Sequence, residues 1–98
     1  MGKYLVLWEV EKAHMSADPK ERGEGWALLM AMTKQDMEKG FVKEWGSVVG
    51  ETRGFNLVEG SEVEIEKMVQ QYVPYINFEV LPISTFSQIE EVVNALTG

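Results

Sequence analysis

A chain of 98 residues has room for one compact domain, spanning residues 1–98, that buries somewhat over ~60% of its unfolded surface. It contains no cysteine, which excludes disulfides, thiolate metal sites and cysteine nucleophiles and favours a cytoplasmic location. Its net charge of −7 makes it an acidic protein that repels phosphate backbones, so nucleic acid is not an expected partner. The apolar runs are too short for a membrane span and no signal-peptide pattern is present, so we expect a soluble protein without membrane contact.

The first predicted element is a strand over residues 3–10, KYLVLWEV, which is apolar on both faces. Alternation along a strand places its side chains in two opposite rows: Tyr4, Val6, Trp8 and Val10 in one, Leu5 and Leu7 in the other. Both faces of such a strand have to be shielded from water, so we expect it inside a small sheet, with helices on one side and a further layer on the other. The pattern leaves open which row faces the helices.

A helix is expected from Asp18 to about Lys39. Asp18 fits the N-cap, Pro19 the first helical position, and Glu21 can return a hydrogen bond to the cap. Gly40 suits the left-handed backbone conformation that commonly ends a helix. An apolar stripe recurs at intervals of three and four residues: Trp26, Leu29, Met30, Thr33 and Met37.

Two strands over residues 41–50 and 54–59 follow, joined as a hairpin by residues 51–53. Glycines at positions 46, 50 and 54 recur every four residues. They lack the lysine and the strand-to-helix context of a phosphate-binding loop. We therefore interpret them as sites of close backbone approach or of a bulge.

Gly60 ends the hairpin, and Ser61 with Glu64 forms the capping box of a second helix, which Pro74 ends. A fourth strand over residues 75–81 comes next. The third helix begins at Ser84, Thr85 or Ser87 and carries an apolar stripe: Phe86, Ile89, Val92, Val93 and Leu96.

The order strand, helix, strand, strand, helix, strand, helix predicts an α+β, ferredoxin-like βαββαβ fold with an added C-terminal helix. Right-handed crossovers place the first and third strands inside a four-stranded antiparallel sheet and all three helices on one face. The opposite face would then leave apolar side chains in water, more than a monomer usually exposes. We therefore expect a homodimer in which two sheets stack face to face.

The run from Gly54 to Ile83, GFNLVEGSEVEIEKMVQQYVPYINFEVLPI, resembles the second half of dimeric α/β barrel proteins and is similar in particular to muconolactone isomerase. The likeness rests on a hairpin strand, a short acidic link and a helix, then on Pro74, Tyr75, Glu79 and Val80. Uncharacterised short families of this superfamily share the FEVLPI-like strand and the capped helix after it. The resemblance implies a pocket between sheet and helices and a dimer held by opposed sheets. Because the superfamily hosts isomerases, cofactor-free monooxygenases, haem-degrading enzymes and sensor modules, it assigns no catalytic residue.

Three side chains are candidate proton carriers. Glu9 continues the second row of the first strand, where partial desolvation would suit it to moving a proton next to a carbonyl. Glu79 lies on a strand expected to neighbour the first, so the two carboxylates can share a site if they face the same side. His14, the single histidine, lies in the loop after the first strand and has the chemistry of a base or haem ligand. The alternative is that all three are simply solvated.

The candidate ligand-binding residues are aromatic or basic: Trp8, Arg22, Trp26, Trp45, Arg53 and Tyr72. The rings would line a flat apolar pocket, and the arginines would hold an anion. Core packing explains the aromatic residues equally well. No cofactor is predicted, and no metal site, because one histidine and scattered carboxylates give no ligand spacing.

Two functions of different class remain. One is a non-catalytic dimeric module that binds a small hydrophobic molecule or only assembles. The other is an enzyme of the muconolactone isomerase or cofactor-free monooxygenase type, acting on a hydrophobic carbonyl or aromatic compound. Buried polar residues close together in a pocket would favour the enzyme, whereas a pocket filled by Trp8, Trp26 and Met30 would favour the module.

Overall fold

The computed structural model describes residues 2–98. Its elements are β1 (Gly2–Val10), the 3-10 helix η1 (Lys12–His14), α1 (Pro19–Glu38), β2 (Val42–Ser47), β3 (Arg53–Gly60), α2 (Glu62–Gln70), β4 (Ile76–Ile83) and α3 (Phe86–Thr97). Apart from the added turn η1, this is the predicted order, and it confirms the ferredoxin-like α+β fold.

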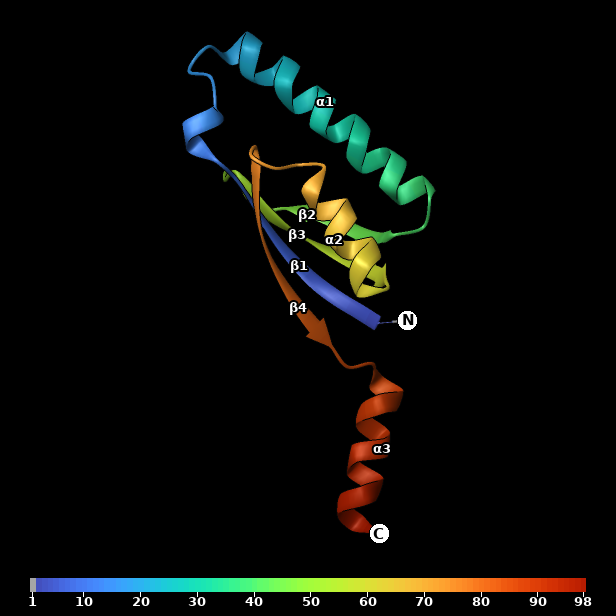
Figure 1. The fold of residues 1–98 in the computed structure, drawn as a ribbon. Coiled ribbons are helices and arrows are strands. Elements are labelled where there is room, and N and C mark those ends of the chain that lie inside the picture. The colour runs from blue at the N-terminus through green and yellow to red at the C-terminus, as the bar shows by residue number, and fades with distance from the viewer. Residues whose placement is uncertain (1) are drawn as a thin grey trace.

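The four strands form one antiparallel sheet in the order β2-β3-β1-β4 (Figure 1). β1 and β3 lie inside and β2 and β4 form the edges, as right-handed crossovers require. The inner position of β1 explains why both of its side-chain rows are mostly apolar.

The row of β1 that meets the helices is the one carrying Val6 and Trp8. Val6 is fully buried and pairs across the sheet with Asn56 of β3 and Val80 of β4, so these side chains point to the same side. We call this side the inner face. The buried apolar core lies between it and the helix layer: Val6, Val42, Val58, Ile65, Met68, Tyr72 and Ile76.

The start of α1 differs from the predicted capping box. Asp18 is the N-cap, and its carboxylate accepts a hydrogen bond from the Lys20 backbone N–H at 3.3 Å. Glu21 does not return to the cap but accepts from the Ser16 hydroxyl at 2.9 Å. The reason is that the Asp18 backbone N–H already donates to Ser16 Oγ at 3.2 Å, so the cap has no free donor for Glu21.

The capping boxes of α2 and α3 are complete. At α2, Ser61 and Glu64 exchange the two expected hydrogen bonds, at 2.9 and 3.2 Å. At α3, the structure selects Thr85 from the three candidate caps, and it exchanges hydrogen bonds with Gln88 at 2.7 and 3.2 Å. Both helices therefore start at a fixed residue with a fixed entry direction.

Of the hairpin glycines, Gly54 marks a close backbone approach, which is one of the two predicted alternatives. A Cβ atom on Gly54 would collide with the Gly46 carbonyl oxygen and with the Trp8 ring. Gly50 has a positive φ of 79° in the turn, which favours glycine. The pairing of β2 with β3 also shifts between Val42 and Glu44, so a bulge is present as well.

The predicted place of the third helix is wrong. α1 and α2 cover the inner face, but α3 continues from the end of β4 and stands clear of the body (Figure 1). Every residue of α3 is exposed. Only Ser84 and Thr85 separate β4 from α3, and the Thr85 capping box directs the helix beyond the end of the sheet. Within residues 2–98, none of the helices has the length and apolar character that crossing a bilayer requires.

The sheet side away from the helices, which we call the outer face, carries a continuous apolar group. Leu5 pairs with Leu57 and Leu81, and Leu7 pairs with Phe55, so these side chains project together. The group consists of Leu5, Leu7, Phe55, Leu57, Leu81 and Ile83. Four of the six are exposed by more than a third, so this side of the sheet presents a contiguous apolar surface to water.

Candidate functional site

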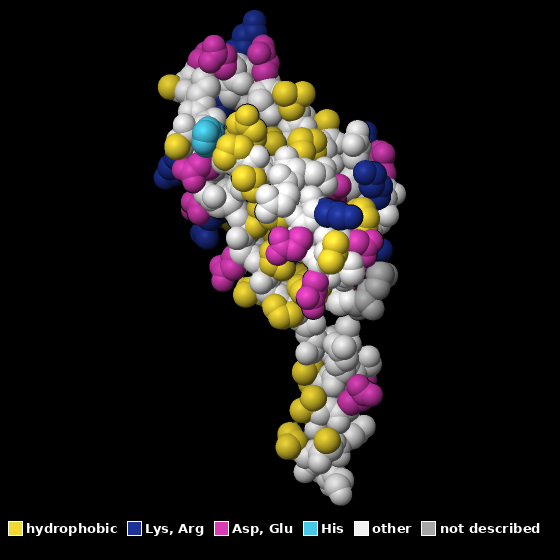
Figure 2. Space-filling model, in the orientation of Figure 1, with side chains coloured by type: hydrophobic (Ala, Val, Ile, Leu, Met, Phe, Trp, Pro, Cys, Tyr) yellow, Lys and Arg dark blue, Asp and Glu magenta, His cyan; other side chains and the backbone are white. Residues whose placement is uncertain are grey.

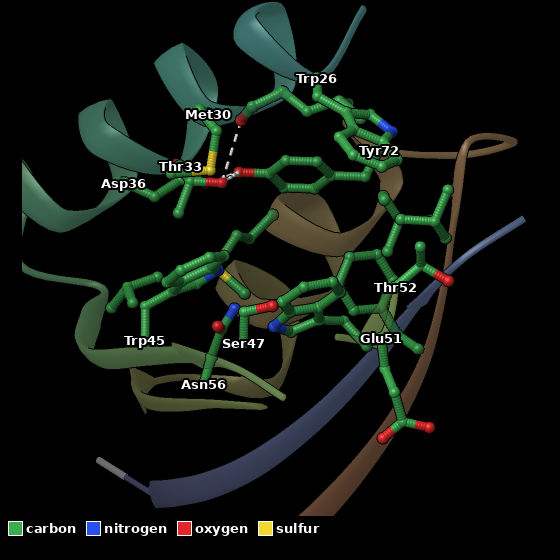
Figure 3. A pocket seen from close by; sticks show the side chains of 17 residues that line it. Trp26, Met30, Thr33, Asp36, Trp45, Ser47, Glu51, Thr52, Asn56 and Tyr72 are labelled. Atoms are coloured by element: carbon green, nitrogen blue, oxygen red, sulfur yellow. Dashed lines mark hydrogen bonds between the residues drawn. The ribbon is translucent and has the colours of Figure 1, made fainter. Parts of the chain in front are cut away.

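A cavity of about 190 Å³ lies between α1 and the inner face of the sheet (Figure 3). An engineered apolar cavity of about 150 Å³ already binds benzene, so this one has room for a six-membered ring with a short substituent. Its lining comes from α1, α2 and all four strands, together with the β2–β3 turn: Trp8, Val10, Trp26, Leu29, Met30, Thr33, Asp36, Val42, Trp45, Ser47, Glu51, Thr52, Asn56, Met68, Tyr72, Ile76 and Phe78.

Aromatic rings make the walls of this cavity. Trp8 and Trp45 stack with ring centroids 5.4 Å apart and planes inclined by 13°. Tyr72 meets Phe78 edge to face at 5.7 Å. Trp26, on α1, is a third exposed. Flat surfaces of this kind accept a planar apolar molecule.

Inside these walls, α1 and the turn that follows α2 are joined by a buried polar contact (Figure 3). The Tyr72 hydroxyl donates a hydrogen bond to Asp36 Oδ2 at 2.7 Å, and the Thr33 hydroxyl lies 3.3 Å from the Tyr72 oxygen. Asp36 is only 1% exposed. A carboxylate that is almost fully buried requires a good hydrogen-bond donor, and Tyr72 provides it.

Burial raises the pKa of Tyr72 above its ordinary value of 10.0, and the neighbouring Asp36 carboxylate raises it further. The hydrogen bond with Thr33 opposes this increase only in part. Tyr72 therefore stays protonated through the neutral and mildly alkaline range and keeps its donor directed at Asp36.

The raised pKa predicts a loss of stability in alkali. The folded state holds the Tyr72 proton more tightly than the unfolded state, in which tyrosine titrates near ~10. This contribution is complete below pH ~10 and is lost above it, at up to ~1.4 kcal/mol per pH unit. Urea unfolding on both sides of pH ~10 should show a steeper fall for the wild type than for Tyr72→Phe. Equal slopes in the two proteins would contradict the prediction, and Tyr75→Phe, at a half-exposed position, is the matched control.

Two further polar atoms in the cavity lining are unpaired. Trp8 Nε1 and Asn56 Oδ1 are buried and have no hydrogen-bond partner within residues 2–98. Asn56 is 7% exposed and pairs with Trp45 on the inner face, directly beneath the cavity. Leaving a buried donor or acceptor unpaired costs about 1–3 kcal/mol. Both atoms are covered by neighbouring side chains, so a molecule in the cavity can pair with them only when those side chains shift.

The structure brings together four of the six residues predicted to bind a ligand: Trp8, Trp26, Trp45 and Tyr72 all line the cavity. Arg22 lies beside it, with its guanidinium carbon 5.6 Å from the centre of the Trp26 ring, at cation–π distance. Arg53 does not line the cavity but pairs at 3.0 Å with Glu51, which does. The cavity is therefore aromatic, and Arg22 and Arg53 do not line it. Ligand binding by these residues stays a prediction.

None of the three predicted proton carriers lines the cavity. Glu9 and Glu79 do share one side of the sheet, but it is the outer face: Glu79 pairs with Leu7, and Glu9 pairs with Asn77. His14 is exposed in η1, where its ring meets Tyr75 edge to face at 5.7 Å. Their proposed catalytic role stays a prediction, and the cavity offers a different carboxylate.

That carboxylate, Asp36, was missed by sequence reasoning, as was Asn56. Asp36 stands seven residues after Leu29 and three after Thr33, so it falls on the inward side of α1. The predicted stripe used the apolar Met37 instead, which is 45% exposed. A charged residue at an inward helical position was the available signal, because such a residue is seldom buried without a reason.

Among residues 2–98, no three His, Asp or Glu side chains gather as they would around a metal ion. The lining residues carry one tyrosine, one serine and two threonine hydroxyls, three indole N–H groups, one amide and two carboxylates, of which only Asp36 is buried. Comparison of the chain with protein-family models and with curated proteins finds no match. What can be said of function therefore comes from this site.

Proposed function

We propose that this protein binds a small planar molecule in the cavity between α1 and the inner face of its sheet. The observation that carries the proposal is a preformed aromatic cavity whose wall holds an unpaired buried donor, Trp8 Nε1, and an unpaired buried acceptor, Asn56 Oδ1. A small-molecule site is typically apolar with a few placed polar groups, and this cavity has that composition.

The two unpaired atoms indicate the chemistry of a ligand that displaces the side chains covering them. Trp8 Nε1 can only donate, so its partner is an acceptor such as a carbonyl oxygen. Asn56 Oδ1 accepts, so its partner is a hydroxyl or N–H group. The size of the cavity and its aromatic walls fit one ring. Hydroxylated aromatic ketones and similar cyclic enols combine these properties.

A matched series of probes tests the proposal: hydroxyacetophenone, acetophenone and ethylbenzene. Binding is followed by the fluorescence of the tryptophans, which all line the cavity. Affinity should fall by about five- to tenfold with each polar group removed. In Trp8→Phe, which keeps an aromatic ring but lacks the N–H, acetophenone and ethylbenzene should bind equally.

Failure of all three probes to bind the wild type would contradict the proposed site. Equal affinity for the three would contradict the roles of Trp8 and Asn56. Native mass spectrometry of the protein as purified is an independent check, since a retained molecule should have the mass and polarity of a small hydroxylated ring compound.

The Asp36–Tyr72 contact favours an isomerase as the second candidate function. The Asp36 carboxylate could take a proton from the carbon next to a ketone and return it to another carbon, while Trp8 Nε1 stabilises the enolate oxygen. Incubation of acetophenone in D₂O separates the two functions. A binding module leaves its methyl hydrogens unexchanged, whereas the enzyme exchanges them and Asp36→Asn abolishes the exchange.

We also infer a homodimer of the dimeric α/β barrel type, held through the outer face. The support is the apolar group on that face, which includes Leu7, Phe55 and Leu81, each more than a third exposed. Stacking two such faces would remove these side chains from water at about 25 cal/mol per Å². In such a dimer Glu9 and Glu79 would lie at the seam between subunits.

A further inference from the structure

The single chain is too extended and too exposed for a protein of its mass. Its radius of gyration is 16.3 Å, and its principal extents are 60 × 26 × 19 Å, whereas a compact chain of this length has a radius of about 13 Å. The long dimension comes from α3, which continues the line of β4 away from the body (Figure 1).

The accessible surface gives the size of the discrepancy. It is 7031 Å² for a mass of 11.1 kDa, and a folded monomer of that mass exposes about 5,650 Å². The difference is roughly 1,400 Å² per chain. Stable homodimers commonly bury about 2,000–5,000 Å² in total, so a second copy burying this excess on both chains would form an interface of normal size.

α3 supplies a large part of the exposed apolar surface. One side of the helix carries five hydrophobic residues: Phe86, Ile89, Val92, Val93 and Leu96, all at least 48% exposed. Figure 2 shows hydrophobic side chains along this helix. We call this set the α3 stripe. A helix of 12 residues is marginal on its own in water, and α3 forms no packed interface with another element of residues 2–98.

We infer that α3 is an exchanged arm, whose stripe packs against a second copy of this chain. The Thr85 capping box and the two-residue link to β4 direct α3 away from its own sheet, while the outer face of the same chain has an apolar group without a cover. The α3 stripe and the outer face can both be covered when two chains meet about a two-fold axis, because each chain contributes one α3 helix and one outer face. The inference extends the proposed homodimer by assigning α3 to its interface.

The test compares two substitutions on opposite sides of α3. Val92→Asp places a charge in the stripe, and Asn94→Asp adds the same charge two residues on, at a position outside the stripe. Sedimentation equilibrium gives the dimer dissociation constant, and far-UV circular dichroism checks the fold. Val92→Asp should raise this constant about 100-fold or more. Asn94→Asp should leave it within about threefold of the wild type, as expected for a surface change.

Each result decides one part of the inference. A dimeric wild type that Val92→Asp weakens and Asn94→Asp does not supports the exchanged arm. A dimer that both variants leave unchanged overturns the role of α3 but keeps the outer-face dimer, which Leu7→Glu then tests separately. A wild type that is monomeric at micromolar concentration overturns both the exchanged arm and the outer-face dimer, whether α3 is free or folded back. The proposed ligand binding in the cavity does not depend on any of these outcomes and is tested separately.

Discussion

Tyr72→Phe is expected to lower the free energy of unfolding by about 2–3 kcal/mol, although it removes a single oxygen atom. The Tyr72 hydroxyl is the donor to Asp36 Oδ2 at 2.7 Å, and Asp36 is 1% exposed. Without that donor, a carboxylate stays buried with neither water nor Tyr72 to stabilise its charge. Urea unfolding at neutral pH measures the loss.

The control for this prediction is Tyr75→Phe. Tyr75 is half exposed, so the same chemical change there should alter stability by less than about 0.5 kcal/mol. A double-mutant cycle with Asp36→Asn adds a second check, because an amide is less costly to leave unpaired than a carboxylate. The effect of Tyr72→Phe should shrink in the Asp36→Asn background. An unchanged effect would mean that the hydroxyl does not act through Asp36.

Gly54→Ala is expected to destabilise the protein by about 3 kcal/mol, at the upper end of the cost of overpacking a core. The added Cβ would collide with the Gly46 carbonyl oxygen of the neighbouring strand and lie 2.7 Å from Cε2 of Trp8. Because backbone cannot move away as a flexible side chain can, β2 must separate from β3. The shift of Trp8 should also weaken ligand binding in the cavity.

Gly23→Ala is the matched control with the opposite sign. A Cβ at Gly23 meets no atom within 4 Å, and alanine is a better helix former than glycine by about 0.5–1 kcal/mol. Thermal unfolding should therefore show a small gain for Gly23→Ala and a large loss for Gly54→Ala. Losses of similar size would show that the close approach of β2 and β3 is not what requires Gly54.

The fold was predictable because local signals and the hydrophobic pattern agree. Ser61 with Glu64 starts α2 where predicted, and the two-sided β1 lies inside the sheet. The site was predictable only in part. Trp8, Trp26 and Trp45 were recognisable as aromatic surface. For Asp36 the sequence offered only its inward helical position, because its hydrogen-bond partner Tyr72 lies 36 residues away.

The sequence by itself determined the order of the main helices and strands, the caps Asp18 and Ser61, the close approach at Gly54 and the inner position of β1. These features depend on local backbone geometry and on the alternation of side chains along a strand, and both are encoded by residues close together in the sequence. Only the tertiary structure decided which row of β1 faces the helices, that Trp8 Nε1 and Asn56 Oδ1 stay unpaired beside one cavity, and that α3 leaves the body. Those depend on the packing of residues far apart in sequence, where a two-residue link and one cap set the direction of an entire helix.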